Sequence, residues 1–484
     1  MFNIISRRSF LERSLQVALG AAASAYSDIP LFLQRAIAQG TIPDGTKKLL
    51  FIFLRGGNDG LNTIIPWGDD AYNTTTRPTL YIPRPDPLTS VSGRIPEKPD
   101  LTRVVDVGNN FAGIHPGLAD LGPVYNAGQV ALVHRVGYPK QSRSHFDSQR
   151  YWENGVPRDN LSGSGIFYRA VVNTGLYQGR KFPAVSVQSG NPLALRGPLA
   201  MTNLASPANY DMAGVAANNV DKQKLLNAIG GQHAIPYPEK DNRDLLFPTG
   251  LSLKDSIESL KSIGLSSNEF YDQNGTTHLF PIVAASNQKG FSASSYGYFN
   301  NIKVAAQILA RTDAVIAGTR LDGFDTHDSQ ATGHAARMQW IGWTIYALKK
   351  FFTDVSPALW DNTVIVTLSE FGRTSKENGN RGTDHAEAGV MFVAGGKVKG
   401  GAYQCGNDNW TVGPAGSMFQ VNSRYLRRSV DYRSVLGEVI RDHLGATTAQ
   451  LGTIIPGYTD ARENLLAGGT TPDGTRIVGE LGIV

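Results

Sequence analysis

Cysteine is almost missing from this chain, which has one, Cys405, among 484 residues. A single cysteine excludes an internal disulfide, and the surrounding "YQCGND" offers no neighbouring base that would activate a thiol. Strong charge of one sign is missing too, because the formal net charge is only +5. We therefore expect neither a disulfide-stabilised fold nor a thiol mechanism, and no binding of nucleic acid.

Long hydrophobic runs are also lacking. After the N-terminal segment, no stretch reaches the ~18 consecutive apolar residues of a membrane helix. Hydrophobic residues make up 41% of the chain and charged residues 18%, which is ordinary for a globular protein with a sizeable core. We expect a soluble protein with no stable transmembrane segment in its mature form.

The N-terminus has the features of an export signal. Arg7 and Arg8 precede a modestly apolar, alanine-rich run, and "AIAQG" contains an Ala-x-Ala cleavage site before Gln39. We predict a twin-arginine signal peptide over residues 1–38, with the twin-arginine translocase as partner and a periplasmic or secreted protein exported in the folded state. The alternative is a basic amphipathic helix or interfacial anchor.

Predicted strands and helices alternate from Lys47 onward. Short apolar runs bounded by turn residues are typical of strands buried on both faces of a mostly parallel sheet. These runs are 49–54, 130–136, 184–187, 314–317, 363–368 and 390–394. Helical patterns follow at 144–153, 302–311, 332–352 and 432–444. The prediction is a single α/β domain over 47–484, with helices on both faces and loop-rich insertions at about 68–110 and 189–290.

Polar side chains gather at the ends of these strands, where an open α/β sheet binds its ligands. The sheet-edge candidates are Asp59 after the first strand; Ser142, Ser144 and His145 after the second; Asp325 and His327 after 314–317; Glu370 after 363–368; and Asp384 and His385 before the last strand. Mixed oxygen and nitrogen ligands suit zinc or manganese, and oxygen-rich sets suit magnesium or calcium. Two divalent ions ~4 Å apart would bind a phosphate or sulfate ester.

Each candidate also has a purely structural interpretation. Asp59 precedes a glycine and suits a turn, Ser144 suits a helix N-cap, and Glu370 could pair with Arg373. Arg55 and Arg373 are candidate anion clamps, although arginines at strand ends often pair with carboxylates instead. Two histidines have other predictions: His115 caps or orients a helix, and His134 is a core residue. His334, seven residues after His327, could support the site from behind it.

Several motifs together resemble one family. "RGGNDGLNT", "SRSHFDSQRYWENG", "GFDTHDSQ", "SEFGRT", "GTDHAEAGVMFVAGG" and the C-terminal "DYRSVLGEVIRDHLG" are similar, in this order, to a bacterial exported family, domain of unknown function 1501. That family in turn resembles a branch of the alkaline phosphatase and sulfatase superfamily. The resemblance implies an alkaline phosphatase-like fold, with two divalent metals at the carboxyl edge of the sheet.

The resemblance also implies roles for single residues. Asp59 and Glu370 resemble metal ligands that follow strands, and Asp325, His327 and His385 resemble the remaining ligands. Ser144 resembles the metal-activated nucleophile, with Ser142 as the alternative; Arg55, His145, His334, Arg373 and Asp384 would clamp an anion or support the ligands. Two departures stand out: the usual Asp-x-x-x-His becomes Asp325-x-His327, and Phe371 stands where related enzymes often have histidine.

These residues leave two hypotheses. The first is an exported metal-dependent hydrolase of phosphate or sulfate esters, acting on a small molecule or a glycan. A sulfatase that uses an oxidised cysteine is excluded, because no Cys-x-Pro-x-Arg motif is present. The second, prompted by the altered ligand spacing, is a non-catalytic exported protein that keeps the fold to bind a glycan, a cell-wall component or another protein.

Overall fold

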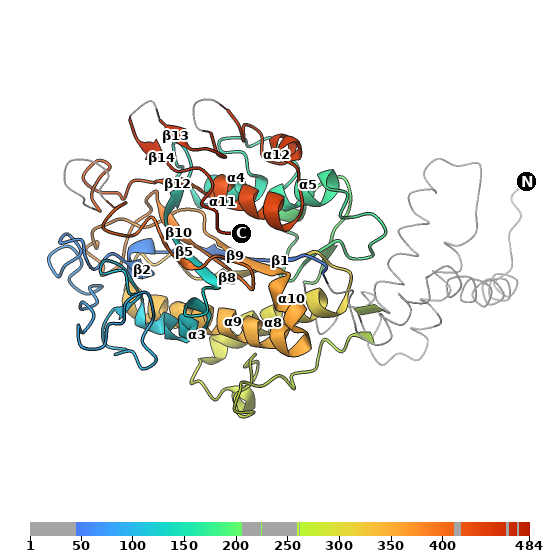
Figure 1. Ribbon diagram of the computed structural model, residues 1–484, viewed down its shortest axis with the longest axis horizontal. Coiled ribbons are helices and arrows are strands. Elements are labelled where there is room, and N and C mark those ends of the chain that lie inside the picture. The colour runs from blue at the N-terminus through green and yellow to red at the C-terminus, as the bar shows by residue number, and fades with distance from the viewer. Residues whose placement is uncertain are drawn as a thin grey trace, which may run out of the picture.

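A nine-stranded sheet forms the centre of the described part of the chain, with helices on both sides (Figure 1). The computed structural model describes residues 45–205, 224, 259–260, 262–410, 418–460, 464–471 and 474–484. The predicted signal peptide over 1–38 and much of the predicted insertion at 189–290 lie outside these residues. No helix among the described residues combines the length and the apolar character needed to cross a membrane.

The strands of the central sheet follow the order β11-β5-β10-β9-β1-β8-β6-β7, with β12 paired to β5. Their bounds are β1 Lys48–Arg55, β5 Val130–Gly137, β6 Ala184–Ser186, β7 Thr202–Asn203, β8 Ile316–Asp322, β9 Thr363–Leu368, β10 Gly389–Gly395, β11 Gly401–Tyr403 and β12 Val430–Asp431. A small three-stranded sheet contains β2 Ile64–Ile65, β3 Val105–Asp106 and β4 Gly113–Ile114. A two-stranded sheet pairs β13 Gly469–Thr470 with β14 Arg476–Ile477.

One strand of this sheet runs against the rest. Strands β1, β8, β9, β6 and β7 pair in parallel, whereas β10 pairs antiparallel with both β9 and β5. The residues that precede β10 therefore lie at the same edge as the residues that follow the parallel strands. This topology brings the Asp384–His385 segment to the edge predicted from the other strand ends.

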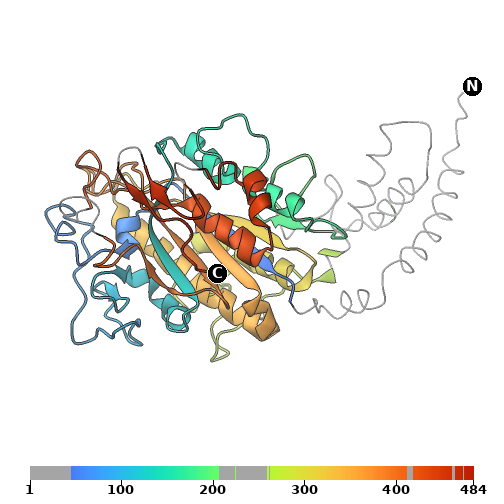
Figure 2. The ribbon, with the colours of Figure 1, turned by 45° about the horizontal axis from the view of Figure 1, so that its top comes forward.

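Helices cover both faces of the sheet (Figures 1 and 2). One face carries α4 His145–Asn154, α5 Ile166–Asn173, α11 Tyr432–Glu438 and α12 Thr448–Ile454, with a π-helix, η7 Val439–His443, extending α11. The other carries α3 Gly122–Tyr125, α8 Tyr296–Arg311, α9 Gln330–Val355 and α10 Pro357–Asp361. Short 3-10 helices are η1 Gly60–Asn62, η2 Pro116–Leu121, η3 Leu193–Leu195, η5 Ala284–Ser286 and η6 Ala293–Ser295. The predicted α/β class is confirmed.

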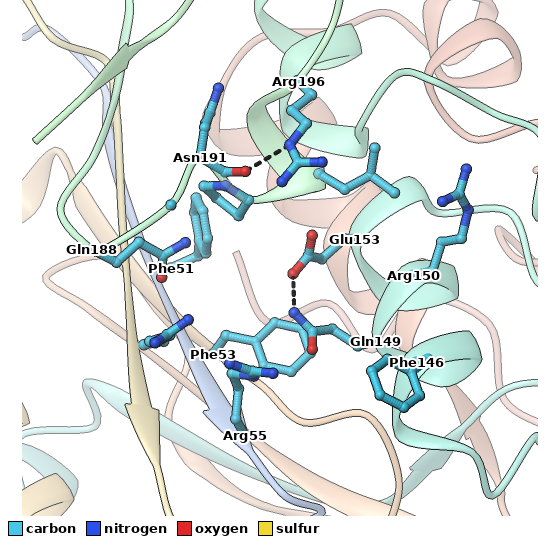
Figure 3. A pocket seen from close by; sticks show the side chains of 14 residues that line it. Phe51, Phe53, Arg55, Phe146, Gln149, Arg150, Glu153, Gln188, Asn191 and Arg196 are labelled. Atoms are coloured by element: carbon cyan, nitrogen blue, oxygen red, sulfur yellow. Dashed lines mark hydrogen bonds between the residues drawn. The ribbon is translucent and has the colours of Figure 1, made fainter. Parts of the chain in front are cut away.

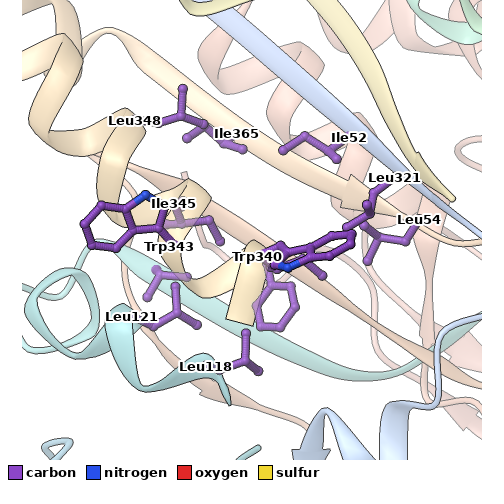
Figure 4. Packing of buried hydrophobic residues seen from close by; sticks show 14 of the residues in the cluster. Ile52, Leu54, Leu118, Leu121, Leu321, Trp340, Trp343, Ile345, Leu348 and Ile365 are labelled. Atoms are coloured by element: carbon purple, nitrogen blue, oxygen red, sulfur yellow. The ribbon is translucent and has the colours of Figure 1, made fainter. Parts of the chain in front are cut away.

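The alternation of side chains along β1 divides the core into two halves. Leu50, Ile52 and Leu54 belong to one buried cluster, and Leu49, Phe51 and Phe53 to the other, as the period of two in a strand requires. In the first cluster, Figure 4 shows Leu54 beside Trp340 of α9, with Leu118 and Leu121 of η2 farther from the strand. A strand covered on both faces explains why this segment is apolar throughout.

Two details differ from the sequence predictions, and two agree with them. Strand β8 extends to Asp322, beyond the predicted end at residue 317, because it stays in parallel register with β1 as far as the Arg55–Asp322 pair. The predicted loop-rich insertion at 68–110 reaches the interior of the protein, since Arg77 is completely buried. His115 caps η2 by accepting from the Gly117 N–H, and His134 is buried with its ring bonded to a backbone carbonyl, as predicted.

Candidate metal centre

Three histidines and one aspartate meet at the carboxyl edge of the sheet. His145 is the first residue of α4, Asp325 and His327 lie in the loop after β8, and His385 precedes β10. Single ligand atoms of His145, Asp325 and His385 lie within 4.8 Å of one another. His327 joins them, because its Nε2 is 2.9 Å from His385 Nε2 and 3.0 Å from Asp325 Oδ1. These four residues are called the His–Asp cluster below.

The outer nitrogen of each ring in the cluster faces a hydrogen-bond acceptor. His145 Nδ1 is 2.9 Å from Glu370 Oε1, and His327 Nδ1 is 3.2 Å from Asp384 Oδ1. His385 Nδ1 is 2.8 Å from the backbone carbonyl of Arg143. An acceptor at Nδ1 holds the proton on that atom, so the lone pair of each neutral ring is on Nε2. This is how metal-binding histidines are oriented.

The three Nε2 atoms all face Asp325. Its Oδ1 is 3.0 Å from His327 Nε2 and 3.1 Å from His385 Nε2, while its Oδ2 is 3.3 Å from His145 Nε2. Zinc bonds of ~2.0–2.1 Å at tetrahedral angles separate neighbouring ligand atoms by about 3.3 Å, which is close to these values. The short spacing of Asp325 and His327 in sequence therefore still brings both to one centre.

Two buried polar atoms in this region lack a hydrogen-bond partner among the described residues. They are His145 Nε2 and Glu370 Oε2, and the Glu370 side chain is only 2% exposed. Buried polar atoms without partners are costly, and a bound cation is one way to satisfy them. The residues present therefore fit a divalent ion.

Hydrogen bonds and charges shift the pKa values in the cluster in different directions. Burial opposes ionisation of Asp325, but its contacts with Arg373 and His385 outweigh burial and lower the pKa of Asp325 to about 2. The hydrogen bond to Glu370 raises the pKa of His145. Burial lowers the pKa of His385, which favours the neutral ring that a metal needs.

Of its two predicted roles, anion clamp or support of the ligands, the contacts of Arg373 fit the second. Its side chain is fully buried and donates to the carbonyls of Gly56, Gly57, Phe324 and Thr383, as well as to Asp325 Oδ1. It thereby ties together the loops that follow β1 and β8 and the loop that precedes β10. The predicted pair between Glu370 and Arg373 does not form, since Glu370 Oε1 accepts from the Gly56 N–H and from His145.

Two glycines allow the loop after β1 to pass close to the cluster. Gly56 and Gly57 have φ values of 120° and 77°, a region that favours glycine. A Cβ on Gly56 would lie 2.2 Å from the Asp325 backbone nitrogen, and one on Gly57 would lie 2.4 Å from the Phe371 ring. The Phe371 ring in turn packs against His145 and His385.

The structure places Asp59, a predicted metal ligand, in a buried ion pair apart from the cluster. Its Oδ2 is 2.7 Å from Arg77 Nη1 and 2.6 Å from Gln330 Nε2, and its Oδ1 accepts from Arg77 Nη2 and from the Leu61 N–H. The attraction of Arg77 outweighs burial and lowers the pKa of Asp59. Both oxygens are occupied, so we do not keep Asp59 among the ligands.

Gln330 connects this ion pair to the cluster. Its Oε1 accepts from the Thr326 and Thr383 hydroxyls, which immediately precede His327 and Asp384 in the chain. Neither Arg77 nor Gln330 was singled out from the sequence. Arg77 sits in a predicted insertion and Gln330 opens a helix, and nothing in their local sequence marks them.

The remaining predicted site residues take several positions. Ser144 is the N-cap of α4, and the Asp147 N–H lies 3.4 Å from its Oγ, while Ser142 Oγ accepts from the Ser144 N–H. Arg55 lies 3.6 Å from Asp322 at the end of β8. His334 is buried, with its ring nitrogen 3.2 Å from the Asn62 carbonyl. His334 therefore lies with the residues around the Asp59 ion pair.

Comparison with models of known protein families gives a match. The model of the family described as "Protein of unknown function (DUF1501)" matches residues 248–423. This DUF1501 region contains Asp325, His327 and His385 but not His145, which α4 supplies from earlier in the chain. None of the curated proteins matches the chain.

Proposed function

We propose that the chain is an exported, metal-dependent hydrolase of phosphate or sulfate esters with an alkaline phosphatase-like fold. The observation that carries this proposal is the convergence of three imidazole Nε2 atoms on the Asp325 carboxylate, with an acceptor at each Nδ1. A divalent ion held there would polarise an ester oxygen and activate a hydroxyl or water. The hydrogen bonds that the surrounding loops make to the three rings and to Asp325 support a centre whose ligands are oriented before the metal binds.

The donor set favours one class of ion. Three nitrogens and one carboxylate suit zinc or another transition metal, whereas magnesium and calcium prefer oxygen ligands. Of the zinc, manganese, magnesium and calcium expected from the sequence, we therefore propose zinc first. Within the described residues, one such group of ligands is present, so the proposal concerns one ion in the cluster, and the second expected ion stays a prediction.

The chain's own residues would have distinct tasks in this reaction. Glu370, Asp384 and the Arg143 carbonyl hold the three rings, and Arg373 holds Asp325. Ser144 is our proposed nucleophile, with Ser142 as the alternative. The 3.4 Å separation between the Asp147 nitrogen and Ser144 Oγ is long for a hydrogen bond, so little energy opposes its release for attack.

Metal content of protein purified from its native export route tests this proposal. We expect about one zinc-class ion in the cluster, lost in His327→Ala and His385→Ala. The control is His278→Ala, which changes a histidine bonded to Asn268 and outside the cluster. Hydrolysis of 4-nitrophenyl phosphate and sulfate should depend on the same ion and disappear in Ser144→Ala with the metal retained. Absence of metal from the native protein would refute the proposal.

The position of Asp59 favours a second candidate function. The carboxylate of Asp59, an expected metal ligand, is bound by Arg77 and Gln330 instead. Without this ligand, the centre would bind a metal and a ligand but would not hydrolyse an ester. This candidate is an exported protein that binds a glycan, a cell-wall component or another protein. Full metal content together with no hydrolysis of either ester across zinc, manganese, magnesium and calcium would favour it over the hydrolase.

A further inference from the structure

A polar cavity lies against the helix that supplies His145. Its volume is about 330 Å³, and Arg150 and Glu153 of α4 line it together with Arg55 of β1, Arg196 after η3 and Arg320 of β8. Figure 3 shows Arg196 and Arg55 at opposite ends of this cavity, with Glu153 between them. It is called the arginine pocket below.

Two regular elements form half of the lining of the arginine pocket, and each contributes side chains from one of its faces. Helix α4 contributes residues 146, 149, 150 and 153, a spacing that places all four side chains on one side of a helix. Strand β1 contributes residues 51, 53 and 55, which alternate onto one side of a strand. Rigid elements on both sides make this a preformed site.

The charge of the arginine pocket is positive. Four arginines line it against one carboxylate, Glu153. That carboxylate is already occupied, because Gln149 Nε2 donates to it at 2.7 Å and the Ala194 N–H at 3.3 Å. Asp322, just outside the lining, lies 3.6 Å from Arg55 and 3.2 Å from Arg320. The arginines outnumber the carboxylates even when Asp322 is counted.

The pocket also offers polar groups and an exposed aromatic ring. The Arg150 Nε and Asn191 Oδ1 atoms are buried and have no hydrogen-bond partner among the described residues. Gln149 and Gln188 add amide groups to the lining. The Phe146 side chain is 89% exposed beside them, although a large apolar ring in water is unfavourable unless something covers it.

We propose that the arginine pocket binds one or two residues of an acidic saccharide, whose carboxylate or sulfate groups pair with the arginines. The planar guanidinium group matches both oxyanions, the amides match hydroxyl groups, and the face of Phe146 matches the apolar face of a sugar ring. The cavity volume lies at the lower end of the range for small-ligand sites. This binding does not depend on the chemistry proposed for the His–Asp cluster.

Binding of defined oligosaccharides, measured by titration calorimetry at low ionic strength, tests the proposal. The probes are trigalacturonate for the carboxylate, a sulfated galactose trisaccharide for the sulfate, and neutral galactotriose. We expect at least one acidic probe to bind and the neutral one to fail, with affinity falling as salt rises. Arg150→Gln and Arg196→Gln should each weaken binding about tenfold, as the loss of a charged hydrogen bond predicts.

Matched variants separate this result from a general charge effect. Arg84→Gln removes an arginine that is paired with Asp70 and lies outside the pocket, and it should bind like the wild type. Phe146→Ala should weaken binding of the saccharide severalfold without changing the weak binding of inorganic sulfate. His385→Ala, which removes a cluster ligand, should leave saccharide binding intact.

Several outcomes would overturn the proposal. Equal binding of acidic and neutral trisaccharides would remove the role of the arginines, and so would a loss in Arg84→Gln as large as in Arg150→Gln. Inorganic sulfate bound as tightly as the sulfated trisaccharide would make the site an oxyanion site without sugar recognition. Thermal unfolding of each variant, compared with the wild type, shows that a loss of binding is not a loss of folding.

Discussion

The substitution Asp59→Asn separates a structural role for this residue from the metal-binding role predicted from the sequence. Both carboxylate oxygens accept hydrogen bonds, from Arg77 on both sides, from Gln330 on one and from the Leu61 N–H on the other. An asparagine amide must therefore place its NH2 against another donor. The change also leaves the Arg77 guanidinium, which is fully buried, without its carboxylate.

The expected loss of stability follows from this burial. Removing one partner of a buried ion pair costs about 3–5 kcal/mol, because the remaining charge is uncompensated. Arg77 keeps the carbonyls of Thr374 and Ser375 and the Asn62 side chain as acceptors, which favours the lower end of that range. With an unfolding entropy of about 2.1 cal/mol/K per residue, a chain of this length should lose roughly 3 °C in Tm.

Thermal and denaturant unfolding of the metal-free protein measures this loss of stability. The metal content of the variant tests the alternative, that Asp59 is a metal ligand. We expect Asp59→Asn to unfold several degrees lower while it still binds metal, and His385→Ala to lose the metal with a stability change of about 1 kcal/mol. The double variant Asp59→Leu/Arg77→Met should recover part of the loss, since it removes both charges. Loss of metal in Asp59→Asn with unchanged stability would refute the reasoning and restore Asp59 as a ligand.

Three further predictions concern the same network. Gln330→Leu should weaken metal binding about tenfold or more, because it releases the two threonines that precede His327 and Asp384. The control Gln339→Leu, on the same helix, should leave metal binding unchanged. Equal effects of the two variants in metal titrations would contradict this. Asp384→Asn should lower metal affinity about 10–100-fold through the weaker hydrogen bond to His327; an unchanged dissociation constant would count against that orienting role. The pKa of Asp59 is lowered in the folded state, so the stability that its carboxylate contributes is present above its unfolded pKa and is lost as pH falls through its folded pKa. Asp59→Asn should therefore lack this acid-dependent loss of stability. Identical acid-unfolding profiles of the variant and the wild type would show that the carboxylate is not the group responsible.

Much of the fold follows from local sequence. Runs such as 49–54 and 363–368 are apolar at every position, which only strands covered on both faces can accommodate. Because parallel strands share one carboxyl edge, the positions of Asp325 and Glu370 followed directly. His385 precedes its strand instead, and it reaches the same edge because β10 runs antiparallel to its neighbours.

The roles within the site were harder to predict. His145 was expected to support the ligands, yet its Nε2 faces Asp325, whereas Glu370 was expected to be a ligand and one of its oxygens orients His145. Which atom of a side chain faces a centre depends on the acceptors around it. Those acceptors come from loops far away in the chain, so short motifs carry little information about them.

The sequence alone therefore determined the α/β class, six of the nine strands of the central sheet and the set of residues delivered to one edge of that sheet, because these depend on hydrophobic periodicity and on chain direction. The short strands β7, β11 and β12 were not predicted. The tertiary structure decided which of those residues meet. Asp59 stands at a strand end like the others, but its carboxylate is bound by the buried Arg77. Arg77 comes from a segment that the sequence predicted only as a loop-rich insertion. A buried charge pairs with the nearest opposite charge, and only the folded chain establishes which charge that is.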